Sequence, residues 1–328
     1  MKFNGLMNRI KLTYLTLFFL LFLSVLISLG YGKGFYELLK GLWCSENFCF
    51  VLKKIRIPRT IFALLIGGSL SICGVTFQSI LRNNLAEPYT LGISGGACFG
   101  ITLSVIFELN SKLGPFANPA MGFLGAMCST YIVFLLSRKR FFDPNQIILF
   151  GIVVSLIFSS LIFFLFSISD PDRMHGVLLW LMGDLSGFES DLIVFYIIIF
   201  LIPAFVLFFL NKELDVLSLG YEKARYLGLN PDTGYSIFFV ITSLLTAFCV
   251  SVAGIIGFVG LIVPHILKIV LGTGSKHILF TSYLAGASLL ILSDTFSRYV
   301  LYPLELPVGV VTGILGGTIL LVLLLKRR

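Results

Sequence analysis

Residues 235–272 read YSIFFVITSLLTAFCVSVAGIIGFVGLIVPHILKIVLG, and this stretch decides the architecture because it could form one helix or two. A helix needs about 20 apolar residues to cross the ~30 Å hydrocarbon core of a bilayer. As a single helix, these 38 residues would measure roughly 57 Å at ~1.5 Å per residue, nearly twice that thickness. Gly254, Gly257, Gly260 and Pro264 also interrupt its second half. The stretch is therefore predicted to form two membrane spans joined by a tight turn.

Eight other segments are apolar and long enough to cross a membrane. They are residues 12–30, 60–81, 91–108, 119–137, 146–168, 191–210, 278–297 and 307–325. The composition agrees, because 57% of the residues are hydrophobic and only 12% are charged, too few to cover a soluble surface. We therefore expect an all-α polytopic membrane protein with ten transmembrane helices, forming a single domain over residues 1–328.

The distribution of charge predicts the direction of these spans. With both termini inside, the inner segments hold 15 Lys and Arg against 6 Asp and Glu, and the outer segments hold 9 against 10. Treating residues 235–272 as one span would place the basic C-terminus outside and weaken this asymmetry. We therefore expect the N- and C-termini in the cytoplasm. The net charge of +8 is interpreted as topology, because the basic residues are scattered and do not form a nucleic-acid-binding patch.

One outer loop breaks the charge rule, since Lys53, Lys54, Arg56 and Arg59 lie at the outer edge of the second span. Cations at helix ends often reach for lipid headgroups, which suits the two lysines. Arg56 and Arg59 suit a second role better, because arginine binds carboxylates in a bidentate geometry. They form a candidate basic pad for an acidic partner. Arg298, at the outer end of the ninth span, is either a helix-end anchor or a second docking point.

The first outer loop also holds Cys44 and Cys49, separated by four residues. If this loop faces an oxidising compartment, these two cysteines could form a disulfide, and the sequence leaves that question open. The other four cysteines lie in apolar runs, where they are expected to pack as small hydrophobic residues.

Motifs for catalysis and metal binding are absent from the sequence. The phosphate-binding pattern G-x-x-x-x-G-K-[ST] does not occur, and the glycine-rich turn at residues 272–276 has the wrong spacing. The chain is therefore not expected to hydrolyse ATP. His175, His265 and His277 are far apart and no H-E-x-x-H occurs, so a metal-dependent enzyme is not expected. His265 follows Pro264 and is expected to bond the backbone that the proline frees.

The source of energy separates two classes of transporter. An ion-coupled secondary transporter generally needs ionisable residues deep in its spans, and this sequence supplies almost none. Asp294 lies one turn before Arg298, so an i, i+4 ion pair is expected there. The favoured source is ATP hydrolysis on a partner subunit, and the ion-coupled secondary transporter remains the alternative.

Seven motifs, in this order along the chain, resemble the iron-siderophore, haem and cobalamin ABC permease family of type II importers. They are RIPRT (56–60), GVTFQ (74–78), RNNLAEP (82–88), LGISGGA (91–97), LSLG (217–220), GFVGLIVPH (257–265) and ELPVG (305–309). The resemblance runs from about residue 50 to the C-terminus, and a set of ordered motifs is far more specific than any single glycine pattern.

The resemblance implies the membrane-spanning permease of an ABC importer in the inner membrane, not an enzyme. The expected cargo is a metal-chelate nutrient, with an iron-siderophore complex first, then haem, then cobalamin. The resemblance also implies a homodimer, an inverted repeat of helices 2–5 and 7–10, two ATPase subunits that carry ATP and Mg, and a periplasmic or lipoprotein substrate-binding protein. No cofactor or metal is expected on the chain itself.

The family also implies three sites. Arg56, Arg59 and Arg298 match positions that dock the binding protein. A short helix predicted at residues 221–228, ended by Gly228 and Pro231, resembles the helix that couples the permease to the ATPase, although a plain amphipathic connector would look similar. Its coupling residues are Glu222, Lys223, Ala224, Arg225, Leu227 and Gly228. The cytoplasmic gate is expected at Asp143, Pro144 and Asn145, between the fourth and fifth spans.

Overall fold

The computed structural model describes residues 2–30, 50–114, 116–140, 142–187, 192–272 and 274–326. Within these ranges the chain is helical, apart from connections and one isolated bridge between Leu301 and Leu304. The all-α prediction is therefore confirmed. Cys44 and Cys49 lie outside the described residues, so their disulfide stays a prediction. Of the other four cysteines, three are buried as expected, but Cys128 is exposed.

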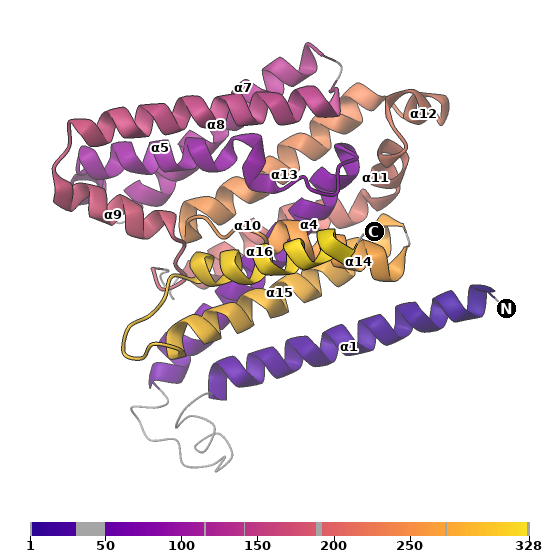
Figure 1. Cartoon of the computed structure of the whole chain (residues 1–328), viewed down its shortest axis with the longest axis horizontal. Helices are drawn as coiled ribbons and strands as arrows, with labels where there is room; N and C mark the ends of the chain where they lie inside the picture. The colour runs from indigo at the N-terminus through magenta and orange to yellow at the C-terminus, as the bar shows by residue number, and fades with distance from the viewer. Residues whose placement is uncertain are drawn as a thin grey trace.

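Most of the long helices run along the long axis of the molecule, which is horizontal in Figure 1. Among the described residues, seven helices are long and apolar enough to cross a membrane, or eight if a pair bent by 60° counts as one span. The seven are α1 (Lys2–Gly30), α4 (Ile57–Ile80), α7 (Ala117–Arg138), α8 (Pro144–Ser167), α13 (Pro231–Ala253), α15 (Ser275–Tyr299) and α16 (Val308–Lys326). The bent pair is α10 (Ile193–Phe209) and α11 (Asn211–Ser218). The ten-span count and the side of the termini stay predictions.

Two further apolar helices are shorter, α5 (Ile93–Ile106) with 14 residues and α14 (Val259–Leu271) with 13. At ~1.5 Å per residue each measures roughly 20 Å, less than the ~30 Å core. Each begins after a residue with left-handed backbone, Gly92 at φ 87° and Phe258 at φ 69°. The chain thus breaks between α13 and α14, within residues 235–272, where the sequence predicts a turn.

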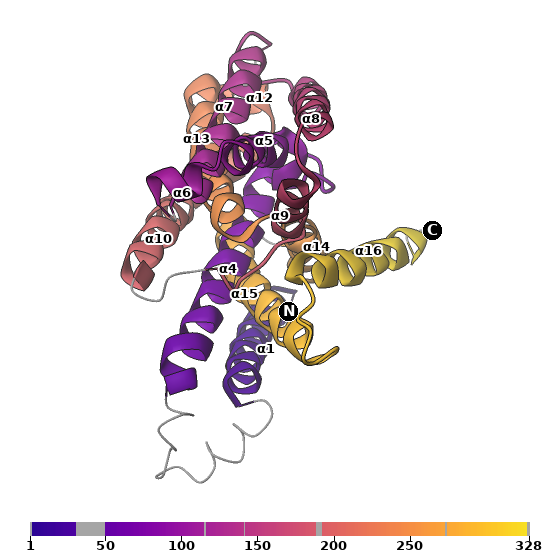
Figure 2. The ribbon, with the colours of Figure 1, turned by 90° about the vertical axis from the view of Figure 1, so that its left-hand side faces the viewer.

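The centre of the bundle is α4, which packs against α15, α14, α13 and α10. Glycines allow these close approaches, because a Cβ at Gly74 would lie 1.7 Å from the carbonyl oxygen of Gly260 in α14. Gly67 of α4 and Gly286 of α15 face each other in the same way, each 2.4 Å from the other's carbonyl oxygen once a Cβ is added. Small residues at helix contacts are typical of membrane bundles. Helices α4 and α15 lie side by side in both ribbon views (Figure 2).

The remaining helices surround this centre. At the edge of the bundle, α1 packs mainly on α15, whereas α5, α7 and α8 form a second group (Figure 1). Two short turns precede apolar helices, a π-helical turn η1 (Leu52–Arg56) before α4 and a 3-10 turn η2 (Pro88–Leu91) before α5. Short helices α6 (Leu109–Leu113) and α12 (Tyr221–Tyr226) lie in connections.

The acidic connection between α8 and α10 contains a helix, α9 (Pro171–Leu181). Arg173 fastens this helix to the end of α5, because its Nη1 donates to the carbonyl oxygen of Ile106 at 2.5 Å. The same guanidinium lies 2.7 Å from the carboxylate of Glu108. Hydrophobic periodicity is hard to see in eleven residues, which explains why the sequence did not reveal α9.

Candidate functional site

Four charged side chains meet where α4 begins and α15 ends, the end of the bundle that the charge pattern predicts to be outside. Nε and Nη2 of Arg59 each lie 2.9 Å from Oδ1 of Asp294, and Nη1 lies 2.9 Å from Oε2 of Glu305. Nε of Arg298 lies 3.1 Å from Oδ2 of Asp294. We call Arg59, Asp294, Arg298 and Glu305 the outer charge cluster.

Three members of the outer charge cluster are buried and one is exposed. The side chains of Arg59, Asp294 and Arg298 are 7%, 1% and 8% exposed, whereas that of Glu305 is 51% exposed. Charged groups inside a membrane protein need partners of opposite charge, and here one carboxylate lies between two guanidinium groups. The cluster therefore stabilises the contact between α4 and α15.

The expected ion pair between Asp294 and Arg298 is confirmed. The sequence reasoning missed the participation of Arg59 and Glu305. An acidic residue in an apolar span predicts a basic partner on a neighbouring span, and that signal could have pointed to Arg59.

The structure brings the three arginines predicted for docking to one region. Nη1 of Arg56 donates to the carbonyl oxygen of Leu29 at the end of α1, at 2.8 Å. Nη2 of Arg298 donates to the hydroxyl of Ser28 at 2.9 Å. The Arg298 contact fastens the end of α1 to the outer charge cluster, and the Arg56 contact fastens it to the turn that precedes α4. In this arrangement all three arginines have partners within the chain, so none projects as an isolated surface cation.

At the opposite end of the bundle, the predicted gate and the predicted coupling helix line the same cavity. This cavity has a volume of about 450 Å³. Asp143 and Pro144 of the gate and Glu222 and Arg225 of α12 line it, together with Arg82, Arg140, Phe142, Tyr221 and Tyr235. The two segments lie some 80 positions apart in the sequence, and the fold joins them.

A row of aromatic rings connects the gate to α12. The ring of Phe142 stacks on Tyr235 with centroids 5.9 Å apart, and Tyr235 faces Tyr221 at 6.4 Å. The hydroxyl of Tyr221 donates to Asp232 at 3.1 Å. The pKa of Tyr221 is raised above its ordinary value, mainly by partial burial and secondly by this hydrogen bond. These rings were not predicted, since nothing in their spacing relates them.

The gate and coupling residues are positioned by ordinary helix-end chemistry. The carboxylate of Asp143 accepts hydrogen bonds from the backbone N–H groups of Asn145 and Gln146, at 2.9 and 3.1 Å, and so caps α8. The predicted helix at residues 221–228 is present as α12, and Gly228 ends it with φ 85°. Within α12, Ala224 is buried while Glu222, Lys223 and Arg225 are partly or fully exposed.

Arg82 is a further residue of this end that the sequence reasoning did not single out. It lines the cavity described above and a second one of about 420 Å³, which Gln78, Asp215 and Lys268 also line. Its backbone is left-handed at φ 47°. A Cβ at Gly220, the residue before α12, would lie 2.8 Å from Nη1 of Arg82. Arg82 therefore touches the junction between α11 and α12.

A polar contact supports the proline inside α14. Pro264 has no N–H, so the carbonyl oxygen of Gly260 lacks its usual helical partner. Nε2 of Gln78, from α4, lies 3.5 Å from this oxygen and donates to the carbonyl oxygen of Leu261 at 3.1 Å. Nζ of Lys268 donates to Oε1 of Gln78 at 3.2 Å. The sequence assigned a backbone contact to the histidine that follows the proline, and that assignment stays a prediction; the contacts described here come from the glutamine of the neighbouring helix.

The breaks before α5 and α14 meet each other. The carboxylate of Glu87 accepts a hydrogen bond from the N–H of Phe258 at 2.5 Å, and the N–H of Ile256 donates to the hydroxyl of Tyr89 at 3.4 Å. In the predicted inverted repeat, α5 and α14 occupy corresponding positions as the third and eighth spans. Interrupted helices at corresponding positions of two repeats often mark the pathway of a transporter. This junction is therefore a candidate part of that pathway.

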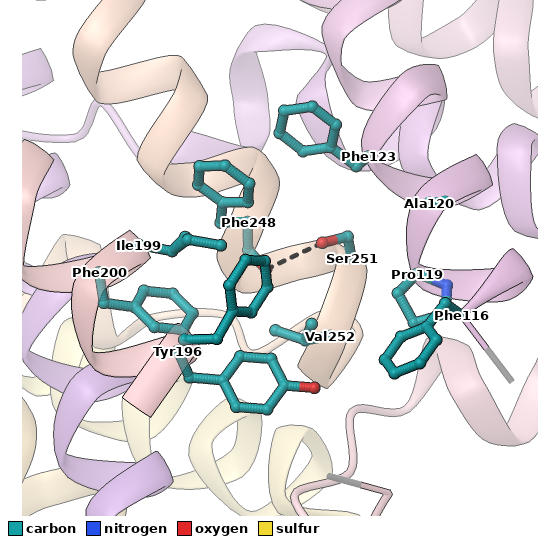
Figure 3. A pocket seen from close by; sticks show the side chains of 11 residues that line it. Phe116, Pro119, Ala120, Phe123, Tyr196, Ile199, Phe200, Phe248, Ser251 and Val252 are labelled. Carbon is teal, nitrogen blue, oxygen red and sulfur yellow. Dashed lines mark hydrogen bonds between the residues drawn. The ribbon is translucent and has the colours of Figure 1, made fainter. Parts of the chain in front are cut away.

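An apolar cavity of about 230 Å³ lies between α7, α10 and α13 (Figure 3). Its lining is rich in aromatic rings. The hydroxyl of Ser251 donates a hydrogen bond to the carbonyl oxygen of Phe248 at 3.0 Å. The side chains that line it are Phe116, Pro119, Ala120, Phe123, Phe195, Tyr196, Ile199, Phe200, Phe248, Ser251 and Val252. This lining suits hydrocarbon and not a charged chelate.

In the ranges that the structure describes, no three His, Cys, Asp or Glu side chains are placed to hold a metal ion. The comparison with known families then decides the class of the protein, because the FecCD transport family matches residues 15–326. The chain belongs to the FecCD transport family.

Relatives in this family cover nearly the whole chain. The chain is 34% identical to the hemin transport system permease protein of Yersinia pestis, over 96% of each chain. It is 33% identical to the vitamin B12 import system permease protein of Salmonella paratyphi A, over 95% of this chain and 94% of the relative. A solved structure described as an inward-facing conformation of a metal-chelate type ABC transporter superposes with a TM-score of 0.86 at 30% identity, covering 96% and 99% of the two chains.

Within the FecCD family, this chain is an integral membrane protein and a transport component, and the predicted resemblance is confirmed. Its two ends carry different chemistry. One end holds the outer charge cluster, with two arginines around a buried carboxylate. The other end holds a cavity that joins the predicted gate to the predicted coupling helix.

Proposed function

We propose that this chain is the permease subunit of an ATP-driven importer that moves a metal chelate across the inner membrane. Membership of the FecCD family supports the class. The observation that carries the mechanism is the shared cavity, because it places Glu222 and Arg225 of α12 beside Asp143 and Pro144 at the start of α8. Movement of α12 caused by an ATPase would therefore reach the gate through the rings of Tyr221, Tyr235 and Phe142.

The proposed cargo is an iron-siderophore complex first, then haem, then cobalamin. The relatives named for hemin and for vitamin B12, and the solved transporter of metal-chelate type, support a large chelate as the class. The contacts within this chain do not rank these three cargoes. Selection of the cargo is assigned to the separate binding protein.

The proposed assembly is a homodimer of this chain with two ATPase subunits and one substrate-binding protein. ATP and Mg are assigned to the ATPase, since the chain lacks a phosphate-binding motif, and no cofactor or metal is assigned to the chain. Apolar residues exposed on α8 and α16, such as Phe163 at 70% and Ile314 at 66%, offer surface for the second copy or for lipid.

The proposed topology has ten spans in one domain, with α5, α14 and α10 completing the count. Both termini lie in the cytoplasm, so α12 and the gate face the ATPase and the outer charge cluster faces the binding protein. The excess of Lys and Arg on the inner segments supports this orientation.

Arg56, Arg59 and Arg298 are proposed to dock the binding protein. They lie together at the outer end, and arginine suits the carboxylates of an acidic partner. Because Arg298 is 8% exposed and bonded to Asp294 and Ser28, its contribution is to hold the carboxylate that positions Arg59. Arg56 presents the contact, and Arg59, which is 7% exposed, offers only the Nη1 that pairs with the exposed Glu305.

The ion-coupled alternative would need a carboxylate that is free to bind and release an ion within the bundle. Asp294 is the deeply buried carboxylate of α15, and Arg59 and Arg298 both hold it. A carboxylate that two guanidinium groups already hold is not free for a cycle of ion binding and release. The contacts of Asp294 therefore do not support an ion cycle at this residue.

Reconstitution in liposomes tests this function. The chain is combined with the ATPase and the binding protein encoded beside it, and uptake of a ferric siderophore, hemin and cobalamin is measured with and without ATP. We expect uptake of one of them only with ATP, and none when the ATPase carries a substitution in its phosphate-binding loop. Uptake by the chain alone, driven by a proton or sodium gradient, would overturn the proposal.

A further inference from the structure

Two carboxylates hold Arg59, and their surroundings differ. Asp294 is buried, with 1% of its side chain exposed, and contacts Nε and Nη2. Glu305 is 51% exposed and contacts only Nη1. Breaking a buried ion pair leaves an uncompensated charge, whereas an exposed pair contributes little because water and salt screen it. The contact with Glu305 is therefore the replaceable one.

We propose that Glu305 is a placeholder for an acidic side chain of the substrate-binding protein. When that protein docks, one of its carboxylates takes the position of Glu305 at Nη1 of Arg59, while Asp294 keeps the other two contacts. The exchange leaves the number of carboxylates around Arg59 unchanged, so the buried guanidinium is never without its partners. This inference rests on the proposed function, because it requires an acidic partner at this end.

Release of Glu305 would act on the start of α16. Glu305 lies in the connection between α15 and α16, where the N–H of Leu306 donates to the carbonyl oxygen of Ser297 at 3.0 Å. The N–H of Val308, the first residue of α16, donates to the carbonyl oxygen of Gly183 at 3.1 Å. Docking is thereby linked to the start of α16 through these two backbone hydrogen bonds.

The start of α16 is also tightly packed. A Cβ at Gly309 would lie 2.4 Å from the carbonyl oxygens of both Ile255 and Met182. Ile255 belongs to the connection between α13 and α14, so a shift at Glu305 reaches the break that precedes α14. Glu305 therefore lies where docking of the binding protein at the outer end can change the packing of α16 within the bundle.

Glu108 provides a matched control for this inference. It is 54% exposed, similar to Glu305, and its carboxylate lies 2.7 Å from Nη2 of Arg173 at the same end of the bundle. Replacing either glutamate by glutamine removes one negative charge from this end. A general attraction for an acidic partner would increase equally in both variants, whereas competition at Arg59 would be relieved only in Glu305→Gln.

The test measures the affinity of the binding protein for the assembled transporter in nanodiscs. The binding protein is the one encoded beside this chain. Because the competing pair is exposed, we expect Glu305→Gln to bind about fivefold more tightly than wild type, and Glu108→Gln to stay within about twofold. Equal changes in the two variants, or weaker binding by Glu305→Gln, would overturn the inference. A wild-type transporter that does not bind at all would instead contradict the proposed function.

Mobility of the connection gives a second readout. Tyr302 is 80% exposed in this connection, so a spin label on Tyr302→Cys, in a chain without its six natural cysteines, reports its motion. We expect the binding protein to increase the mobility of the label in an otherwise wild-type chain. With Glu305→Gln the label should be mobile from the start and change little on docking. An unchanged label on docking in the wild-type background would count against the exchange.

Discussion

Arg59 and Asp294 lie 235 positions apart in the chain, and Nε and Nη2 of Arg59 both lie 2.9 Å from the same oxygen, Oδ1, of Asp294. The pair fastens the beginning of α4 to the end of α15, two helices that also touch through Gly67 and Gly286. The arginine that the sequence offers for docking therefore also holds the bundle together.

Asp294→Asn should destabilise the protein strongly. The substitution leaves two buried arginines without their shared negative charge, and removing one partner of a buried ion pair costs about 3–5 kcal/mol. Thermal unfolding in detergent should show a clear fall in Tm. Glu305→Gln removes the exposed partner of the same arginine, and its cost should stay below about 1 kcal/mol. Similar losses in both variants would contradict the role of the buried carboxylate.

Gln78→Leu should also destabilise the protein, by about 1–3 kcal/mol, because it removes the Nε2 donor from the carbonyl oxygen of Gly260, which Pro264 leaves without its helical partner, and from that of Leu261. Pro264→Ala restores an N–H to α14. In a double-mutant cycle, the cost of Gln78→Leu should therefore be smaller in the Pro264→Ala background. An additive cycle would show that the amide of Gln78 does not substitute for the missing helical hydrogen bond.

Gly74→Ala should prevent normal packing of α4 on α14. Its Cβ would lie 1.7 Å from a backbone oxygen of Gly260, which cannot move aside as a side chain can. We expect a loss of about 3 kcal/mol or more, or failure to fold, measured by Tm and by the yield of monodisperse protein. Gly313→Ala in α16 is the control, since a Cβ there would meet nothing within 4 Å and should leave the Tm unchanged or raised.

Leu227→Asp should uncouple transport from ATP hydrolysis. Leu227 follows α12 directly and is 62% exposed, so a partner could bury it, and a carboxylate there would oppose an apolar contact. We expect uptake in liposomes to fall about tenfold or more, with the bundle intact. Tyr226→Ser changes a neighbouring residue that is 87% exposed and is not among the predicted coupling residues. Equal losses in the two variants would contradict the assignment of Leu227.

Much of the fold follows from patterns that are local in the sequence. The break within residues 235–272 was predicted from length and from glycine and proline, and α13 and α14 meet there. The short helix at residues 221–228 was predicted from its capping glycine and is present as α12. Both features depend on residues close together in the chain, where helix length and helix-end chemistry decide the outcome.

The parts that sequence reasoning missed depend on contacts between distant segments. Nothing near Arg59 indicates that Glu305 will reach it, and nothing near Pro264 indicates that Gln78 will support its backbone. The row of rings from Phe142 to Tyr221 is likewise formed only by the packing of three segments. The reduced length of α5 was missed for another reason, because residues 91–108 are apolar beyond the helix itself.

The long separation between Arg59 and Asp294 has a consequence for how the protein is made. At about 5–20 residues per second, the ribosome needs roughly 10 to 50 s to pass from one residue to the other. During that interval, α4 enters the bilayer with a cation whose buried partner has not yet been synthesised. α1 is likewise synthesised long before its main neighbour, which is also α15. The first two long helices therefore depend on the insertion machinery or on lipid headgroups until the ninth predicted span has been synthesised. A chain that stops before that point keeps an unpaired charge, which quality-control proteases can recognise.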